Sequence, residues 1–233
     1  MLSASQAAVG ATFLTSKCFQ FGHPELQVSV SDQTIPRSDV DWFLATLESM
    51  VAAGGRFKAG ETMQIGWMIM KIEQGDRGAI KLTEPDMKSI PVKFVDSANA
   101  TIRHLRVQKD SVESVLPASS LQFPFLSQSV VVHVNYRQAR KLVLERLAPR
   151  GTDSGWWFSD LSDASGSKDA SRLMKISLYQ LALDRPDLIK FFAFPNGAQV
   201  VVDRQVGVLK DGVELPIKRG SLLDLLNQRE AER

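Results

Sequence analysis

The sequence is poor in the features that mark secreted and membrane proteins. It has a single cysteine, Cys18, so it cannot form an internal disulfide bond. Its longer apolar runs, such as VVVHV at 130–134, fall far short of the roughly 20 residues that span a bilayer. The first 21 residues carry neither the basic start nor the sustained apolar stretch of a signal peptide. These absences exclude a disulfide scaffold and predict a cytoplasmic protein that does not contact membranes.

The chain also has little excess charge of either sign. Its 28 basic and 26 acidic residues give a net charge of +2, which provides no broad basic face for nucleic acid. We therefore expect no direct binding of nucleic acid. The hydrophobic content of 44% is enough for a full core, which is typical of a folded globular protein.

Catalytic and cofactor signatures are scarce as well. The three histidines are scattered, and with one cysteine they form no metal-ligand spacing, so we predict no metal site. The stretch 55–62, GRFKAGET, resembles a phosphate loop but has Glu61 where a lysine is needed. A carboxylate there would repel phosphates, so we predict no nucleotide and no other cofactor. The sequence favours a protein that is not an enzyme.

Strand and helix patterns alternate irregularly along the chain. Apolar spacing predicts helices at 36–55, 98–116, most of 169–194 and 221–233. Alternation and turn residues predict strands at 26–31, 62–73, 78–84, 128–136 and 198–203, while 137–149 is ambiguous. Without a regular βαβ period, the pattern predicts an α+β fold with mixed or antiparallel sheets flanked by helices.

A stretch without clear periodicity divides the chain. Residues 117–125, PASSLQFPF, hold two prolines and two serines and are typical of a linker. We therefore predict two α+β domains, 1–118 and 119–233.

The most unusual local sequence is DSGWW at 153–157, followed by an aspartate-rich stretch. Because neighbouring residues of a strand face opposite sides, one of Trp156 and Trp157 is expected in the core and the other outside. An exposed tryptophan beside acidic groups is typical of a protein-binding hot spot. We predict a partner-binding site made of Asp153, Trp156, Trp157, Asp160, Asp163 and Asp169. A purely structural loop that ends in core aromatics is the alternative.

The C-terminal third resembles a known family. The order of Asp153-Ser154-Gly155-Trp156, an acidic loop at 160–169, a helix near 171–183 and a segment from Pro186 to Gly197 is similar to immunity protein family thirty-three. The resemblance implies a protein that binds and neutralises a cognate bacterial toxin without chemistry of its own. Such proteins occur in type VI secretion effector–immunity pairs, so the implied partner is an effector encoded nearby.

If the toxin is a nuclease of the cytoplasm, its basic cleft is one that an acidic loop could fill. Two alternatives to the immunity function stay open at this point. One is a small hydrolase or lyase that uses Glu84 and Asp86, or the Asp153 region. The other is a non-catalytic adaptor or scaffold of a secretion system.

Overall fold

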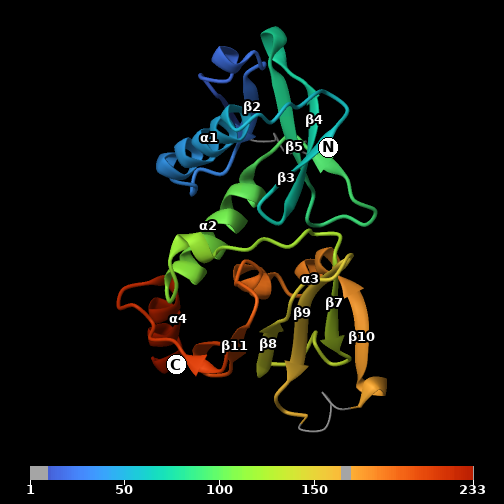
Figure 1. The fold of residues 1–233 in the computed structure, drawn as a ribbon, viewed down its shortest axis with the longest axis vertical. Helices are drawn as coiled ribbons and strands as arrows, with labels where there is room; N and C mark the ends of the chain where they lie inside the picture. Colours follow the sequence, from blue (N-terminus) through green and yellow to red (C-terminus); the bar gives the residue numbers. More distant parts are fainter. Residues whose placement is uncertain (1–9, 164–168, 233) are drawn as a thin grey trace, which may run out of the picture. The chain divides into compact units, whose positions relative to one another are not determined.

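The computed structural model describes residues 10–163 and 169–232, and its contacts divide the chain into two compact units. The first unit is Met1–Arg103 and the second is His104–Arg233. The division falls within helix α2 (Asn99–Glu113), before the proline-containing stretch at 117–125 (Figure 1). The placement of separate domains at 1–118 and 119–233 stays a prediction.

The first unit is built on a mixed sheet. Its described residues form six strands in the order β1-β2-β5-β4-β3, with β6 paired to β5. The pair β2·β5 is parallel and the other pairs are antiparallel. The strands are β1 (Ala11–Leu14), β2 (Leu26–Val30), β3 (Thr62–Ile65), β4 (Met68–Gln74), β5 (Ile80–Pro85) and β6 (Phe94–Val95).

Helix α1 (Arg37–Ala52) confirms the helix predicted at 36–55. Its apolar positions at helical spacing are the buried ones, namely Val40, Phe43, Leu44, Leu47 and Val51. Gly54, with φ of 99°, ends it in the left-handed conformation, and its N–H donates to the Val51 carbonyl over 3.0 Å.

The single strand predicted at 62–73 is wrong. The chain turns at Gly66, whose φ is 61°, and β3 and β4 pair as an antiparallel hairpin in which Ile65 faces Met68. The apolar run continued through Trp67, which is fully buried, so the pattern did not reveal the turn.

Glu84, at the end of β5, forms hydrogen bonds with residues 97–101 at the start of α2 through both of its carboxylate oxygens. One carboxylate oxygen accepts from Ser97 Oγ at 2.5 Å and the Ala100 N–H at 3.0 Å. The other accepts from the Thr101 N–H at 2.7 Å and its hydroxyl at 2.9 Å. The side chain is only 2% exposed, so it joins the sheet to the positive end of a helix.

The second unit contains a larger mixed sheet. Its described residues form seven strands in the order β10-β7-β9-β8-β11-β12-β13, with β7·β9 parallel and the other pairs antiparallel. The strands are β7 (Ser129–His133), β8 (Leu142–Arg146), β9 (Asp153–Asp160), β10 (Leu173–Ser177), β11 (Ala198–Val202), β12 (Val206–Lys210) and β13 (Val213–Glu214). The helical segments are α3 (Leu178–Asp184), the 3₁₀ segment η5 (Pro186–Phe191) and α4 (Leu222–Ala231). The predicted α+β class is therefore confirmed.

The prediction of helix over most of 169–194 is wrong for its first part. Residues Leu173–Ser177 form β10, which pairs residue by residue with β7. Leucine, methionine and lysine favour helices, but cross-strand pairing and packing override this weak propensity. Arg185 occupies the cap position of η5, and the carboxylate of the preceding Asp184 binds Tyr136, Arg137 and Gln180.

We predict that Glu84→Gln destabilises the fold by about 2–3 kcal/mol, because the charge-assisted bonds to the first turn of α2 are weakened while the group stays buried. Urea unfolding followed by circular dichroism measures the change. Asp86→Asn is the matched control and should cost less than about 0.5 kcal/mol, since Asp86 is half-buried and its oxygen serves a local turn to the Lys88 N–H. Equal losses in both variants would contradict the capping role.

Candidate partner-binding site

The DSGW motif forms a bulge in the central strand β9. The strand pairing steps from Ser129↔Asp153 to Val131↔Trp157, so β9 accommodates two more residues than β7 over this interval. The Asp153 carboxylate accepts from the Gly155 N–H at 2.8 Å. Ser154 Oγ donates to the Ser129 carbonyl at 2.8 Å and accepts from the Trp156 N–H at 3.2 Å. The first three residues of the motif therefore shape the backbone.

Gly155 is required by this geometry. Its φ is 79°, in the left-handed region, and a Cβ there would lie 2.1 Å from the Leu147 carbonyl oxygen. The Gly155 carbonyl in turn accepts from the Leu147 N–H at 2.8 Å. No other residue type fits this close approach of two backbones.

Trp156 lies in the core, with 1% of its surface exposed. Its indole N–H donates to the Phe192 carbonyl at 3.1 Å. The Arg146 guanidinium, directly across on β8, donates to the same oxygen at 3.1 Å and lies 5.2 Å from the Trp156 ring centre. Burial lowers the pKa of Arg146 to about 10. Trp156, one of the residues of the predicted site, is therefore a buried core side chain.

Trp157 faces the opposite side of the sheet and is half-buried, as strand alternation requires. In the register it lies between Val131 of β7 and Glu145 of β8. We call the side chains that share its side of the sheet the Trp157 face; they are half-buried and include Val131, Val143, Glu145, Trp157, Gln199 and Val201.

Alternation also divides the predicted acidic residues. Asp160 falls on the same side of β9 as Trp156 and Phe158, opposite to Trp157. Asp153 instead forms a 2.9 Å ion pair with Lys175, which shares a cross-strand row with Val131 on the Trp157 face. The six residues of the predicted site therefore do not form one surface.

Three of the aspartates form ion pairs or hydrogen bonds with neighbouring residues. Asp163 contacts the His133 ring at 3.1 Å and the Arg172 guanidinium at 2.6 Å. Asp169 caps a short 3₁₀ turn through the Ser171 hydroxyl and N–H, and these bonds lower its pKa. Burial opposes ionisation of Asp153, but the Gly155 N–H and Lys175 outweigh it and lower the pKa of that carboxyl.

These partners could not be recognised in the linear sequence. Within the sequence of residues 153–169, Lys168 is the one basic residue, and it lies outside the described residues. In the fold, β10 brings Lys175 beside Asp153, and Arg172 just before it reaches Asp163. The acidic charge of the loop is therefore partly neutralised. Among the described residues, the Asp160 carboxylate makes one local bond, accepting from the Ser162 N–H at 2.8 Å.

Three loops meet at one end of the sheet, which we call the loop end. The register places the end of β7, the start of β8 and the end of β9 together, since Leu142 faces Asp160 and Val132 faces Phe158. Val202 of β11 faces Leu142 in the same row. The loop end therefore comprises the described residues 134–141, 161–163, 169–172 and 203–205.

Polar contacts with Asp184 and Arg185 hold the loop at 134–141. Tyr136 is buried, and its hydroxyl donates to Asp184 at 2.5 Å. Arg185 donates to the carbonyls of Tyr136 and Ala139 at 2.6 and 3.0 Å. Burial first, and then the hydrogen bond and charge of Asp184, raise the pKa of Tyr136 to about 12.

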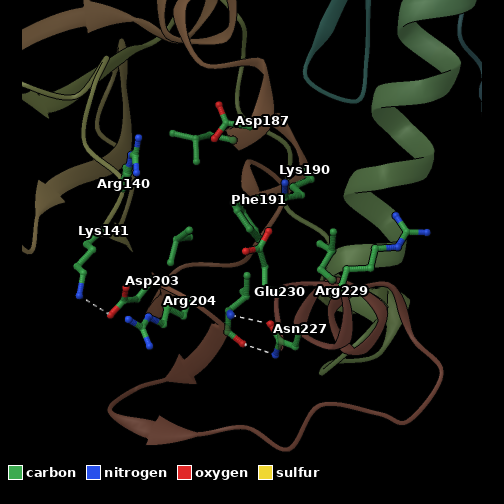
Figure 2. A pocket seen from close by; sticks show the side chains of 14 residues that line it. Arg140, Lys141, Asp187, Lys190, Phe191, Asp203, Arg204, Asn227, Arg229 and Glu230 are labelled. Atoms are coloured by element: carbon green, nitrogen blue, oxygen red, sulfur yellow. Dashed lines mark hydrogen bonds and ion pairs between the residues drawn. The ribbon is translucent and has the colours of Figure 1, made fainter. Parts of the chain in front are cut away.

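A pocket of about 650 Å³ opens beside the loop end, between β11, β12, η5 and α4 (Figure 2). Its apolar lining is Leu188, Phe191, Val202, Val206 and Leu226. Five basic residues and three acidic residues complete it: Arg140, Lys141, Lys190, Arg204 and Arg229, with Asp187, Asp203 and Glu230. No sequence pattern predicts this pocket, because its residues come from four separate stretches of chain.

Two of the three acidic residues of the pocket are already paired. Asp203 binds Lys141 at 3.1 Å, and Asp187 binds Arg185 through two contacts of 2.9 and 2.8 Å. Lys190 is half-buried, with its nitrogen 5.2 Å from the Phe191 ring centre. Burial lowers the pKa of Lys190, against the opposing attraction of Asp187.

We predict that Gly155→Ala destabilises the second unit by at least about 2 kcal/mol, because the new Cβ meets the Leu147 carbonyl and the residue must keep a positive φ. Thermal unfolding checks this. Gly207→Ala, in β12 of the same sheet, is the control: nothing lies within 4 Å of its Cβ position, so it should be close to neutral. A Gly155→Ala protein as stable as Gly207→Ala would contradict the bulge geometry.

We predict that Tyr136 ionises near pH 12 instead of pH 10. The sequence has two tyrosines, so the Tyr179→Phe variant reports Tyr136 alone by its absorbance at 295 nm after a rapid pH jump. Because the folded pKa exceeds the unfolded value, this group stabilises the fold below about pH 10, and the effect is lost between about pH 10 and 12. Asp184→Asn should move the ionisation toward 10; a titration near 10 in the parent would contradict the contact.

Comparison with known proteins identifies the second unit. Residues 107–211 match the family described as the Imm33-like domain. No curated protein and no solved structure matches the chain. The match runs from within α2 to the turn after β12, and it includes the bulge, the loop end and most of the pocket lining. The resemblance to immunity protein family thirty-three is thus confirmed for residues 107–211, the segment that matches the Imm33-like domain.

Proposed function

We propose that the protein is an immunity protein that binds a cognate bacterial toxin and neutralises it by occlusion. The match of residues 107–211 to the Imm33-like domain is the observation that carries this proposal. The matched segment contains all three loops of the loop end and every residue named for the Trp157 face. A binding function therefore has suitable surfaces within the family segment.

The contacts of Glu84 favour inhibition by binding over hydrolysis. Both of its carboxylate oxygens accept hydrogen bonds from the 97–101 segment, so neither is directed at a substrate. A general acid or base needs an oxygen within hydrogen-bond reach of the reacting group. The hydrolase based on Glu84 and Asp86 is thus the weaker candidate.

Within the predicted site, we assign direct contact with the toxin first to Trp157. It is the half-buried tryptophan of the pair, on a sheet face with three valines, and tryptophan is enriched at binding hot spots. Asp160 is the second candidate, because within the described part of the chain its carboxylate serves a local turn. Asp153, Asp163 and Asp169 shape the backbone around this surface, and Trp156 fixes the strand from the core.

The resemblance also supports finer proposals about the partner. We infer that the toxin acts in the cytoplasm and belongs to a type VI secretion effector–immunity pair. Among the residues that the structure describes, no helix is long and apolar enough to cross a bilayer. A nuclease is one toxin class whose basic cleft would be complementary to Asp160.

The proposal is tested by co-expression with the product of the adjacent gene in a sensitive cell. Rescue from killing, together with a stable complex that co-purifies, is the expected result. A stable complex without rescue would favour an adaptor or scaffold of a secretion system. Killing without either would contradict the immunity function.

We predict that Trp157→Ala weakens the complex by at least tenfold, because the largest side chain of the Trp157 face is removed. Asp160→Lys should weaken it as well if the partner surface is basic there. Isothermal titration calorimetry with the purified toxin measures both, and Trp42→Ala and Asp41→Lys on α1 of the first unit are matched controls. Unchanged affinity in Trp157→Ala, with loss in the α1 controls, would place the contact in the first unit.

A further inference from the structure

The pocket of Figure 2 combines an apolar floor with cations that lack acidic partners. Figure 2 shows Arg140, Arg204 and Lys190 on different sides of the hollow. No carboxylate among the described residues forms an ion pair with any of these three side chains, although Asp187 attracts Lys190. Arg229 points away from the hollow in the same view, so it is not counted among the cations that a ligand would contact.

Two of the three acidic residues of the pocket are held by other cations. Asp203 is paired with Lys141, and Asp187 accepts from Nε and one terminal nitrogen of the Arg185 guanidinium. Without Arg229, the pocket residues carry four basic and three acidic groups. Lys190 is half-buried among apolar atoms, where a cation is costly unless an anion approaches.

The size and lining of the pocket restrict the ligand. A volume of about 650 Å³ is within the range of pockets that hold small ligands or a few side chains. Val202, Val206 and Leu226 are half-buried and offer contact to an apolar group, whereas Leu188 and Phe191 are almost fully buried. Arg140 and Arg204 are exposed. A ligand that fits both parts has an apolar side chain next to separated carboxylates.

A nucleotide fits less well. Concentrated phosphate charge requires several donors aimed at one point, such as a glycine-rich loop at a helix N-terminus. The cations here are spread around the hollow, and carboxylates lie between them. Separate carboxylates match dispersed cations better than a polyphosphate does.

We infer that this pocket binds an acidic peptide segment with an apolar side chain between its carboxylates. The inference rests on the proposed function in one respect: the segment belongs to the bound toxin. The toxin would then present an acidic element to the pocket beside Asp160, opposite in sign to the basic cleft expected for a nuclease. The pocket and the Trp157 face lie on opposite sides of the β-sheet, so a partner that reaches both must wrap around an edge of it.

The chemistry of the pocket is tested on the full chain, labelled with ¹⁵N, by titration with acetyl-Glu-Leu-Glu-amide and with the neutral acetyl-Gln-Leu-Gln-amide. The acidic peptide should shift the amide signals of residues 188–191 and 202–206, and the neutral one should not. The Arg140→Glu/Arg204→Glu variant should bind the acidic peptide at least tenfold more weakly. Arg150→Glu, an exposed arginine at the opposite end of the sheet, should bind as the parent does.

Three results would overturn the inference. Equal binding of both peptides would mean that the pocket is only an apolar surface. Shifts caused by inorganic phosphate or ATP, without shifts caused by the acidic peptide, would identify a phosphate site. An absence of shifts with the acidic peptide at millimolar concentration would mean that the pocket is not a site for this ligand.

The co-expression assay separates this inference from the proposed function. If the acidic peptide binds but the parent protein gives no rescue, the proposed function fails and the chemistry of the pocket stands. If the parent rescues and Arg140→Glu/Arg204→Glu rescues equally well, the immunity function stands and the toxin does not use the pocket. Loss of rescue in the double variant, with Arg150→Glu unaffected, is the expected result.

Discussion

The carbonyl oxygen of Phe192 connects the family motif to the rest of the second unit. It accepts the indole N–H of Trp156 and the guanidinium of Arg146, both at 3.1 Å, from two neighbouring strands. A buried donor without a partner costs about 1–3 kcal/mol, so these bonds fix where the segment after η5 crosses the sheet. The bulge at Gly155 sets the position of Trp156, and that position depends on the absence of a Cβ near Leu147. The DSGW motif is thus explained by backbone geometry and core packing.

The proposed binding surface is not the DSGW motif itself. A motif that shapes the core does not have to touch the partner, and the structure gives each of its four residues an internal contact. The residues available to a toxin are those that the bulge and the register place around it. On one side of β9 these are Trp157 and its neighbours, and on the other they are Asp160 and the pocket lined by Arg140 and Arg204.

Sequence reasoning predicted the elements whose signals are local. The helix at 36–55, with its buried stripe and its terminal glycines, is α1, and the strand at 198–203 is β11. It failed where pairing decides the structure. Residues 173–177 have helix-favouring side chains but complete the sheet edge beside β7, and a fully buried Trp67 concealed the turn between β3 and β4.

The predicted site shows the same limit. Alternation correctly indicated that one of the two tryptophans is buried, because this rule depends only on neighbouring residues. The partners of the aspartates are Lys175 in β10 and Arg172 just before it. Both lie in a segment that was predicted as helix, so their neutralising effect was not foreseen. The pocket gathers side chains from the loops and α4, which no local pattern connects.

The central claim is that the family segment binds its toxin with Trp157 outside and Trp156 inside as a structural residue. The most direct test is the ¹⁵N spectrum of the four tryptophan indole groups, recorded with and without the toxin. The account predicts that the Trp157 signal changes on binding while the Trp156 signal, held by the Phe192 carbonyl, keeps its position. A change of the Trp156 signal with Trp157 unaffected, or changes confined to Trp42 and Trp67 of the first unit, would contradict it.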